Sequence, residues 1–254
     1  MGNWEIIHVE PDCHVPFHDE KAWGLNLKVA EERQPTHYIK LGDWLDVYSL
    51  SRHQKDPGVA KKYGTIKDEL EVGNAMLDVQ DRILRRTKNK VYIMGNHEAR
   101  FDAYIANKAP ELFGMTSIEE GLNLKKRGWK VVPYREAYSL GHITYTHDAG
   151  SHGGNAHLDA ERVHCGNIVI GHTHRLGYAI VGNRKGKPHL AMMCGWLGDF
   201  KAANYIHQAI SNRWWSHGLA AGRMNPKTGV TYLSPVPMIN YTACVDGVVY
   251  EAGR

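Results

Sequence analysis

The sequence predicts an α/β protein whose strands carry polar residues to one edge of a parallel sheet. Short apolar runs typical of strands alternate with longer amphipathic segments typical of helices. Several of the apolar runs stop abruptly at Gly, Asp, Asn or His. The clearest is residues 91–94, which Gly95, Asn96, His97 and Glu98 follow directly. Because α/β enzymes keep their chemistry at the carboxyl ends of parallel strands, this tetrad marks a candidate site.

Length and composition suit one large globular domain. The chain has 254 residues, of which 43% are hydrophobic and 23% charged, and this is enough to bury a substantial core. No apolar run approaches the roughly 20 residues that a membrane helix needs, so no membrane association is expected. The start of the chain lacks the features of a secretory signal. The four cysteines lie far apart without a C-x-x-C pair, which favours a reducing, cytoplasmic location.

The charge balance is mildly basic, with a net charge of +4 and a pI of about 8.8. This is compatible with a polyanionic substrate and does not identify one. The 16 histidines are the clearest anomaly of the composition. Several of them end apolar runs beside Asp or Gly, as metal-binding histidines do.

The first half of the chain alternates strands and helices. Strands are expected at 4–10, 36–41 and 91–94, and helices at 19–33, 65–88, 98–107 and 116–124. The intervening residues 47–63 are polar and contain Pro57-Gly58, which predicts a surface loop that shapes access to the site.

The second half is mostly β. Strands are expected at 129–133, 136–140, 142–147, 167–170, 177–182 and 188–194, with weaker runs at 229–233 and 243–250 and one helix at 153–165. Trp196, Trp214 and Trp215 lie in a Gly-rich stretch. We interpret them as core or lid aromatics, with stacking on nucleic-acid bases as the alternative.

Polar clusters follow five of the expected strands. In chain order they are Asp12-x-His14, Gly42-Asp43, Gly95-Asn96-His97-Glu98, His147 and Gly171-His172-x-His174. Any one of them alone is also typical of an ordinary turn. Together they supply enough carboxylate, amide and imidazole ligands for two divalent ions. This mixed set suits Mn²⁺, Fe or Zn²⁺ better than Ca²⁺ or a thiolate site.

In these five clusters the chain resembles the calcineurin-like metallophosphoesterases, whose pattern is D-x-H, G-D, G-N-H-E/D, H and G-H-x-H. The resemblance spans residues 5–174 and extends to compact phage or bacterial members described as DNA-repair-exonuclease-like. It implies a four-layer αββα sandwich of two mixed sheets flanked by helices. It also implies one domain over 1–254, in which residues 175–254 complete the second sheet.

The resemblance assigns a role to each matching residue. Asp12, His14 and His174 would bind one metal ion. Asn96, His147 and His172 would bind the other, and Asp43 would bridge the two. A bridging hydroxide would attack phosphorus, His97 would protonate the leaving oxygen, and Asp46 would orient that histidine. Mn²⁺ is the expected ion, with Fe, Zn²⁺ and Ni²⁺ as alternatives.

The chain departs from the family pattern in ways that leave its substrate open. Protein phosphatases of this type have an Arg after the second Asp to grip phosphate, where this chain has Val47. Arg52 and Arg100 are candidates to replace it, although neither is aligned with that motif. Asp148 stands where Gly is usual, and neither it nor Glu98 receives a role. We expect a phosphodiesterase or nuclease. Arg and Lys residues around 82–90, 125–127 and 184–187 are compatible with it, although a solvated face near the end of a helix explains those at 82–90 better than a nucleic-acid patch.

Two alternatives remain: a phosphomonoesterase acting on small molecules or proteins, and a non-catalytic, metal-stabilised binding module. The expected partner is a phosphoester substrate, with nucleic acid as one possibility, in the cytoplasm or, for a phage protein, the host cytoplasm. The sequence does not indicate an oligomeric state.

Overall fold

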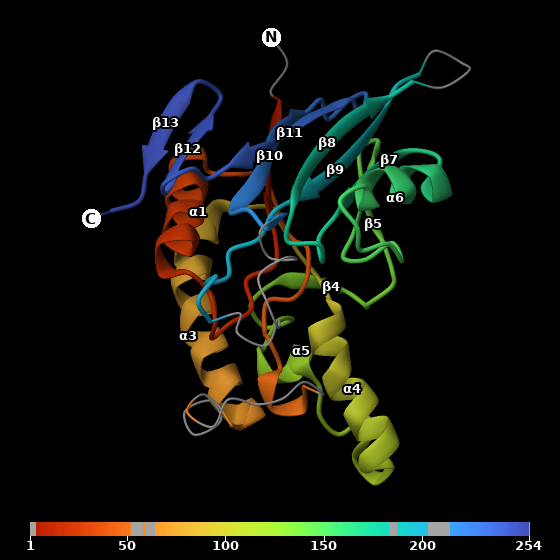
Figure 1. The fold of residues 1–254 in the computed structure, drawn as a ribbon. Helices are drawn as coiled ribbons and strands as arrows, with labels where there is room; N and C mark the ends of the chain where they lie inside the picture. The colour runs from red at the N-terminus through yellow and green to blue at the C-terminus, as the bar shows by residue number, and fades with distance from the viewer. Residues whose placement is uncertain (1–3, 52–57, 59–63, 183–186, 203–213, 254) are drawn as a thin grey trace.

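Two β-sheets face one another in the computed structural model, and helices cover their outer faces (Figure 1). The structure describes residues 4–51, 58, 64–182, 187–202 and 214–253. Arg52, most of the expected loop 47–63 and residues 184–186 of one basic stretch lie outside these ranges. No helix in the described part of the chain has the length and apolar character needed to cross a membrane.

The first sheet has six strands in the order β11-β10-β1-β2-β3-β4. Its strands are β1 (Glu5–Glu10), β2 (His37–Lys40), β3 (Asn89–Ile93), β4 (Trp129–Val132), β10 (Gly218–Met224) and β11 (Thr231–Pro237). β1 to β4 run parallel, and β10 and β11 add antiparallel strands beside β1. The carboxyl ends of β1, β2 and β3 therefore meet at one edge of this sheet.

The second sheet has five strands in the order β5-β6-β7-β9-β8. Its strands are β5 (Tyr138–Leu140), β6 (Ile143–Thr146), β7 (Asn167–Ile170), β8 (Leu176–Val181) and β9 (His189–Cys194). The central strands β6, β7 and β9 are parallel, and the edge strands are antiparallel to their neighbours. A separate hairpin is formed by β12 (Thr242–Val245) and β13 (Val248–Glu251).

The core between the sheets is continuous and apolar. Val9, Ile39 and Val91 of the first sheet belong to the same buried cluster as Tyr145 and Val169 of the second. Because successive side chains of a strand alternate between faces, the other faces pack on helices. The expected four-layer αββα sandwich is thereby confirmed.

The helices lie outside this pair of sheets (Figure 1). They are α1 (Glu20–Arg33), α3 (Ile66–Ile83), α4 (Asn96–Lys108), α5 (Ile118–Gly121) and α6 (Ala156–His164), with single 3-10 turns η1 (Tyr48–Leu50), η2 (Leu84–Arg86) and η3 (Pro110–Leu112). α1, α3 and α4 contribute to the apolar cluster that includes Tyr38 and Tyr92 of the first sheet. α6 packs on Ile168 and Ile170 of the second sheet.

Local sequence signals begin the two long helices. Asp19 accepts hydrogen bonds from the backbone N–H groups of Lys21 and Ala22 at the start of α1. Thr65 and Asp68 form a reciprocal capping box at the start of α3. Both devices satisfy N–H groups that have no partner within the helix.

The expected strands up to residue 194 all begin and end within two residues of the observed ones. Two expectations need correction. The expected helix 116–124 is only the short α5, followed by turns. Residues 175–254 do not simply complete the second sheet, because only β8 and β9 join it, whereas β10 and β11 extend the first sheet. β10 was not anticipated, since its sequence GLAAGRM has small residues and none of the β-branched or aromatic residues that usually mark a strand.

Candidate metal centre

The predicted ligands come together where the two sheets meet. Four of them follow the first sheet's strands β1, β2 and β3, and the other three follow β6 and β7 of the second sheet. The full set is Asp12, His14, Asp43, Asn96, His147, His172 and His174. Each has a ligand atom close to that of another member of the set, and all except Asn96 and His172 are almost completely buried.

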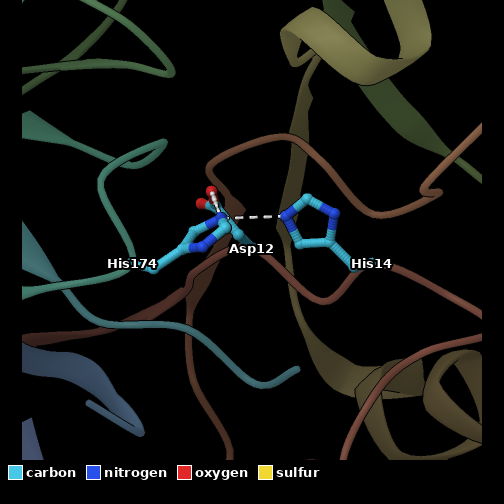
Figure 2. A group of neighbouring side chains, drawn as sticks. All are labelled: Asp12, His14 and His174. Atoms are coloured by element: carbon cyan, nitrogen blue, oxygen red, sulfur yellow. Dashed lines mark hydrogen bonds and ion pairs between the residues drawn. The ribbon is translucent and has the colours of Figure 1, made fainter. Parts of the chain in front are cut away.

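The first group consists of Asp12, His14 and His174, and Figure 2 shows the three side chains pointing toward one another. The Nε2 atoms of His14 and His174 are 2.9 Å apart, and Nε2 of His174 is 3.2 Å from Oδ2 of Asp12. Two imidazole nitrogens and a carboxylate oxygen converging on one buried point form a typical ligand set for a divalent transition metal.

The second group surrounds His147. Its Nε2 lies 2.9 Å from Oδ1 of Asn96 and 3.3 Å from Oδ2 of Asp43. Ligand atoms of Asp43, His147 and His172 all lie within 4.8 Å of one another. Burial and the charge of His147 lower the pKa of His172, which favours the neutral imidazole that a metal requires.

Asp43 lies between the two groups. Its Oδ2 is 3.3 Å from Nε2 of His147 and 3.8 Å from Nε2 of His14. Burial works against ionisation, but the charges of His147 and His97 hold the pKa of this carboxyl well below its usual range. The same attraction outweighs burial at His147 and raises its pKa to about 10. A divalent cation would have to displace the proton that this cluster favours on His147.

Neighbouring groups orient two of the histidines. Nδ1 of His147 donates to the carbonyl oxygen of Leu41 at 2.7 Å, so in the neutral ring Nε2 is the nitrogen with the lone pair. Nδ1 of His14 lies 2.9 Å from Oδ1 of Asp46, which likewise turns Nε2 toward His174. Hydrogen bonds of this kind, which fix the ring nitrogen that does not bind the ion, are typical of metal-binding histidines. The residues present therefore fit divalent cations.

Four of these residues have left-handed backbones. The φ angles are 56° for His14, 48° for Asp43, 64° for His172 and 57° for His174. Residues other than glycine adopt such angles uncommonly, although Asp and His do so more readily than most residue types. We did not predict this from the sequence, because nothing in the residue types Asp and His specifies it.

Gly95 allows the ends of β2 and β3 to approach closely. A Cβ atom at this position would collide with the backbone nitrogen and a side-chain oxygen of Asp43, and would lie 2.8 Å from its Cγ. The backbone of Gly95 is extended, so the requirement for glycine comes from this contact and not from its conformation.

We expect Gly95→Ala to destabilise the fold by about 1–3 kcal/mol, as overpacking of a rigid site usually does, and to weaken metal binding. Denaturant unfolding and metal titration measure the two effects. Gly24→Ala in α1 is the matched control, because a Cβ there meets no atom within 4 Å, and it should be neutral or stabilising by up to about 1 kcal/mol. Equal stability of the two variants would contradict the role given to Gly95.

His97 lies beside the metal ligands, against both carboxylates. Its Nδ1 donates to the backbone carbonyl of Asp46 at 2.7 Å and is 3.3 Å from the Oδ1 of the same residue. Its Nε2 is 3.8 Å from Oδ2 of Asp43. Burial disfavours the charged ring, but Asp43 and Asp46 raise the pKa of His97 above its ordinary value. Asp46 thus contacts His97, as expected, and also His14, which was not anticipated.

Arg100, a candidate replacement for the phosphate-binding arginine, contacts His97. It lies one helical turn after His97 in α4, and its Nη2 is 2.8 Å from Nε2 of that ring. This arginine disfavours a proton on His97, whereas the two carboxylates favour one and outweigh it. The guanidinium group of Arg100 beside the ring is also suited to binding phosphate oxygens.

Glu98, to which the sequence assigns no role, holds the ends of β2 and β3 together. Its buried carboxylate accepts hydrogen bonds from the backbone N–H groups of Asp43, Leu45 and Gly95 and from the hydroxyl of Tyr92, at 2.8–3.1 Å. Removal of such an acceptor would leave several buried donors unsatisfied. Glu98 therefore fixes the position of Asp43.

Glu69 of α3 supports the turn after Asp46. Its carboxylate accepts hydrogen bonds from the backbone of Val47, Tyr48 and Ser49, the last at 3.2 Å. Val47 itself has a φ of 51°, which is strained for a β-branched residue. Burial, together with the negative charge of Asp46, raises the pKa of Glu69 to about 8.

This pKa predicts a pH-dependent stability. The folded chain binds the proton of Glu69 more tightly than the unfolded chain, whose pKa is the ordinary 4.5. This difference stabilises the fold fully below pH 4.5, and the stabilisation is lost as the pH rises toward 8. Gln does not titrate, so the melting temperature of Glu69→Gln should rise relative to that of the unmodified chain between about pH 5 and pH 8.5. The expected rise is about 2–4 °C for each kcal/mol of folding stability that the unmodified chain loses. Glu71→Gln, on an exposed position of α3, should show no such trend. A difference in melting temperature between Glu69→Gln and the unmodified chain that does not change with pH would contradict this prediction.

The basic stretches lie away from the centre. Residues 82–90 run into the first two residues of β3, and residues 125–127 precede β4. Both stretches therefore lie at the amino ends of these strands, opposite the candidate site. Lys90 and Arg127 are also paired with Asp81, at 2.7 Å and 2.9 Å. These two stretches therefore do not support the nuclease interpretation as a track leading to the site.

The tryptophans divide between core and surface. Trp196 is buried and stacks on His174, with ring centroids 4.9 Å apart and planes at 14°, which confirms its interpretation as a core aromatic. Trp215 presents an edge to the same histidine at 4.3 Å. Trp214 is 70% exposed.

Solved structures similar to this chain share little sequence with it. Vacuolar protein sorting 29 (Vps29) from Cryptosporidium parvum is 14% identical with a TM-score of 0.48, and the match covers 97% of this chain and 94% of that chain. Zinc-complexed Vps29 from Entamoeba histolytica is 14% identical with a TM-score of 0.45, covering 96% and 95%. A predicted phosphoesterase from Streptococcus pneumoniae is 11% identical with a TM-score of 0.35, covering 100% and 95%. No model of a known protein family matches the chain, and no curated protein sequence matches it.

Proposed function

We propose that this chain is a calcineurin-like phosphoester hydrolase that uses two divalent cations. The observation that supports this most strongly is the convergence of all seven predicted ligands from five strand ends, with His97 beside them. A non-catalytic binding module would need the ligands but not a buried histidine held between two aspartates.

In this proposal Asp12, His14 and His174 hold one ion, Asn96, His147 and His172 hold the other, and Asp43 contributes to both. When bound, the two ions would lower the pKa of water and neutralise charge on the phosphoryl group. Mn²⁺ is the ion that we expect, with Fe, Zn²⁺ and Ni²⁺ as alternatives, since the ligand set accepts each of them.

His97 would supply the proton that the leaving oxygen needs. Asp43 and Asp46 favour its charged form, and the carbonyl of Asp46 fixes Nδ1, so Nε2 is the nitrogen that transfers the proton. Arg100 donates to this Nε2 in the structure. It would therefore have to turn away when His97 is protonated, and a phosphate oxygen is a suitable new acceptor for it.

Within phosphoester hydrolysis we propose phosphodiesters, including nucleic acid, as the first substrate class. The support is the net charge of +4 and the presence of Val47 where protein phosphatases have an arginine. Arg100 favours the second candidate, a phosphomonoesterase, because a guanidinium beside the site can bind a terminal phosphate in bidentate fashion.

A substrate panel separates these candidates. The chain, freed of metal with a chelator and reloaded with Mn²⁺, is assayed on phosphomonoesters, linear and cyclic phosphodiesters, single- and double-stranded DNA, and RNA. Hydrolysis of diesters above monoesters is the expected result, and activity on monoesters alone would favour the second candidate. Binding of two ions without hydrolysis of any substrate would instead indicate a binding module and contradict the proposal.

A further inference from the structure

His172 has one engaged imidazole nitrogen and one without a partner. Its Nε2 lies 2.7 Å from Nδ1 of His152. Its Nδ1 is buried and has no hydrogen-bond partner among the described residues. A neutral imidazole carries its proton on one nitrogen and a lone pair on the other. The contact at Nε2 therefore determines whether Nδ1 carries the proton or the lone pair that a metal ion needs.

We propose that His152 is a positioning residue for the metal centre. It accepts a hydrogen bond from Nε2–H of His172, which leaves the lone pair of His172 on Nδ1 and directs that nitrogen to a divalent cation. This inference rests on the proposed function, in which His172 binds the ion held with Asn96 and His147. His14 and His147 are oriented in the same way, by Asp46 and by the carbonyl of Leu41.

The backbone of His172 is fixed as well. Its N–H donates to Oδ1 of Asp12 at 3.1 Å, and its φ of 64° places it in the left-handed region. The ring planes of His152 and His172 are inclined by 61°, with centroids 4.7 Å apart, so the rings meet at their edges and do not stack. This arrangement is compatible with a hydrogen bond between the two nitrogens, which lie 2.7 Å apart.

Three hydrogen bonds hold the turn that carries His152, although the residue itself is exposed. Oδ1 of Asp148 accepts from the N–H of Gly150 at 2.6 Å, and Oδ2 accepts from the hydroxyl of Tyr134 at 3.0 Å. The hydroxyl of Ser151 donates to Asp159 of α6 at 2.9 Å. Because the turn is already ordered, less side-chain and backbone entropy is lost when His152 engages His172.

The same residues suggest a competing arrangement. Ligand atoms of Asp148, His152 and His172 lie within 4.8 Å of one another, so a separate cation could in principle bind there. Both oxygens of Asp148 already accept hydrogen bonds from Gly150 and Tyr134. A third cation would also require His172 to use both ring nitrogens as ligands, which a neutral imidazole cannot do. The structure therefore favours the hydrogen bond.

Zinc titration and histidine NMR test the inference. His152→Ala is compared with His164→Ala, a matched change at an exposed histidine at the end of α6. We expect His152→Ala to bind one of two Zn²⁺ ions about 10–100-fold more weakly, as loss of a ligand's hydrogen-bond partner typically does. The stoichiometry at saturation should remain two. His152→Gln, whose side-chain oxygen can accept from Nε2–H, should recover part of the loss.

Long-range ¹H–¹⁵N spectra of the metal-free chain report the tautomer of His172 directly, with its signals assigned from a His172→Gln variant. The expected result is the Nε2–H form in the unmodified chain and a mixture of forms in His152→Ala. Unchanged zinc affinity in His152→Ala, or an Nδ1–H form in the unmodified chain, would overturn the inference. So would loss of a third ion while two stay tightly bound.

The two proposals fail in different ways. If the unmodified chain binds no divalent ion, the proposed function is wrong, and the tautomer of His172 still decides whether His152 positions it. If the chain binds two ions and hydrolyses phosphoesters but His152→Ala titrates like His164→Ala, only the inference about His152 is wrong.

Discussion

Asp43→Asn is expected to remove the metal centre and, with it, hydrolysis. The Asp43 carboxylate lies between the two ligand groups, and an amide offers one oxygen where two cations would need two. We expect the metal content to fall from two ions per chain to one or fewer. We expect kcat/KM to fall by about 10³-fold or more, equivalent to about 4 kcal/mol of transition-state stabilisation. Elemental analysis and a phosphoester assay measure the two losses.

Asp102→Asn is the control for this change, since Asp102 is an exposed residue of α4 outside the ligand set. It should keep both ions and full activity. Asn at position 43 can still accept the hydrogen bond from the backbone N–H of His97, so circular dichroism should show a folded protein. A folded Asp43→Asn variant with two tightly bound ions would show that Asp43 is not a shared ligand.

His97→Asn is expected to keep both ions but slow hydrolysis by about 10²–10⁴-fold, the usual contribution of a positioned general acid. The deficit should depend on the leaving group. A nitrophenolate leaves without a proton, so the variant should lose little on nitrophenyl esters. An alkoxide needs protonation, so the loss should be largest on alkyl esters. Steady-state rates on a leaving-group series, with metal content measured in parallel, decide the outcome.

His164→Asn is the control here, because it removes an exposed imidazole at the end of α6 that is outside the predicted ligand set. Its rates should match those of the unmodified chain on every ester. An equal deficit for His97→Asn across the whole series, or a loss of metal, would mean that His97 acts as a ligand or a structural residue and not as an acid.

Much of the fold could be predicted because each strand near the site is a short apolar run that ends at a polar cluster. Asp12 and Asp43 follow the ends of β1 and β2 by two and three residues, and parallel pairing then brings these ends to one edge. The sequence could not indicate that β10 joins β1, since the small residues of β10 resemble a turn-rich stretch. The backbone of Gly222 in β10 lies against that of Tyr232 in β11, a contact that only the folded chain reveals.

The ligand set could be proposed from the sequence, and the structure brings its members together, but the residues that support it could not be identified in advance. Glu98 contacts Asp43 across 55 positions of the chain. Glu69 supports the turn after Asp46 from a different helix. These contacts join residues far apart in the chain, so no local spacing pattern predicts them. The sequence also does not indicate whether a Glu is buried or exposed. Arg100 lies one turn from His97, so helical spacing could have indicated it.

Each proposed cation would take ligands from both sheets, because Asp12 and Asp43 follow strands of the first sheet and His174 and His147 follow strands of the second. The centre would then cross-link the sandwich at the edge where its halves meet. Binding to the folded chain alone would add about 2.7 kcal/mol of stability at a metal concentration of 100 times Kd. A cell short of the metal would consequently lose protein as well as activity, since chains that open more often are degraded sooner.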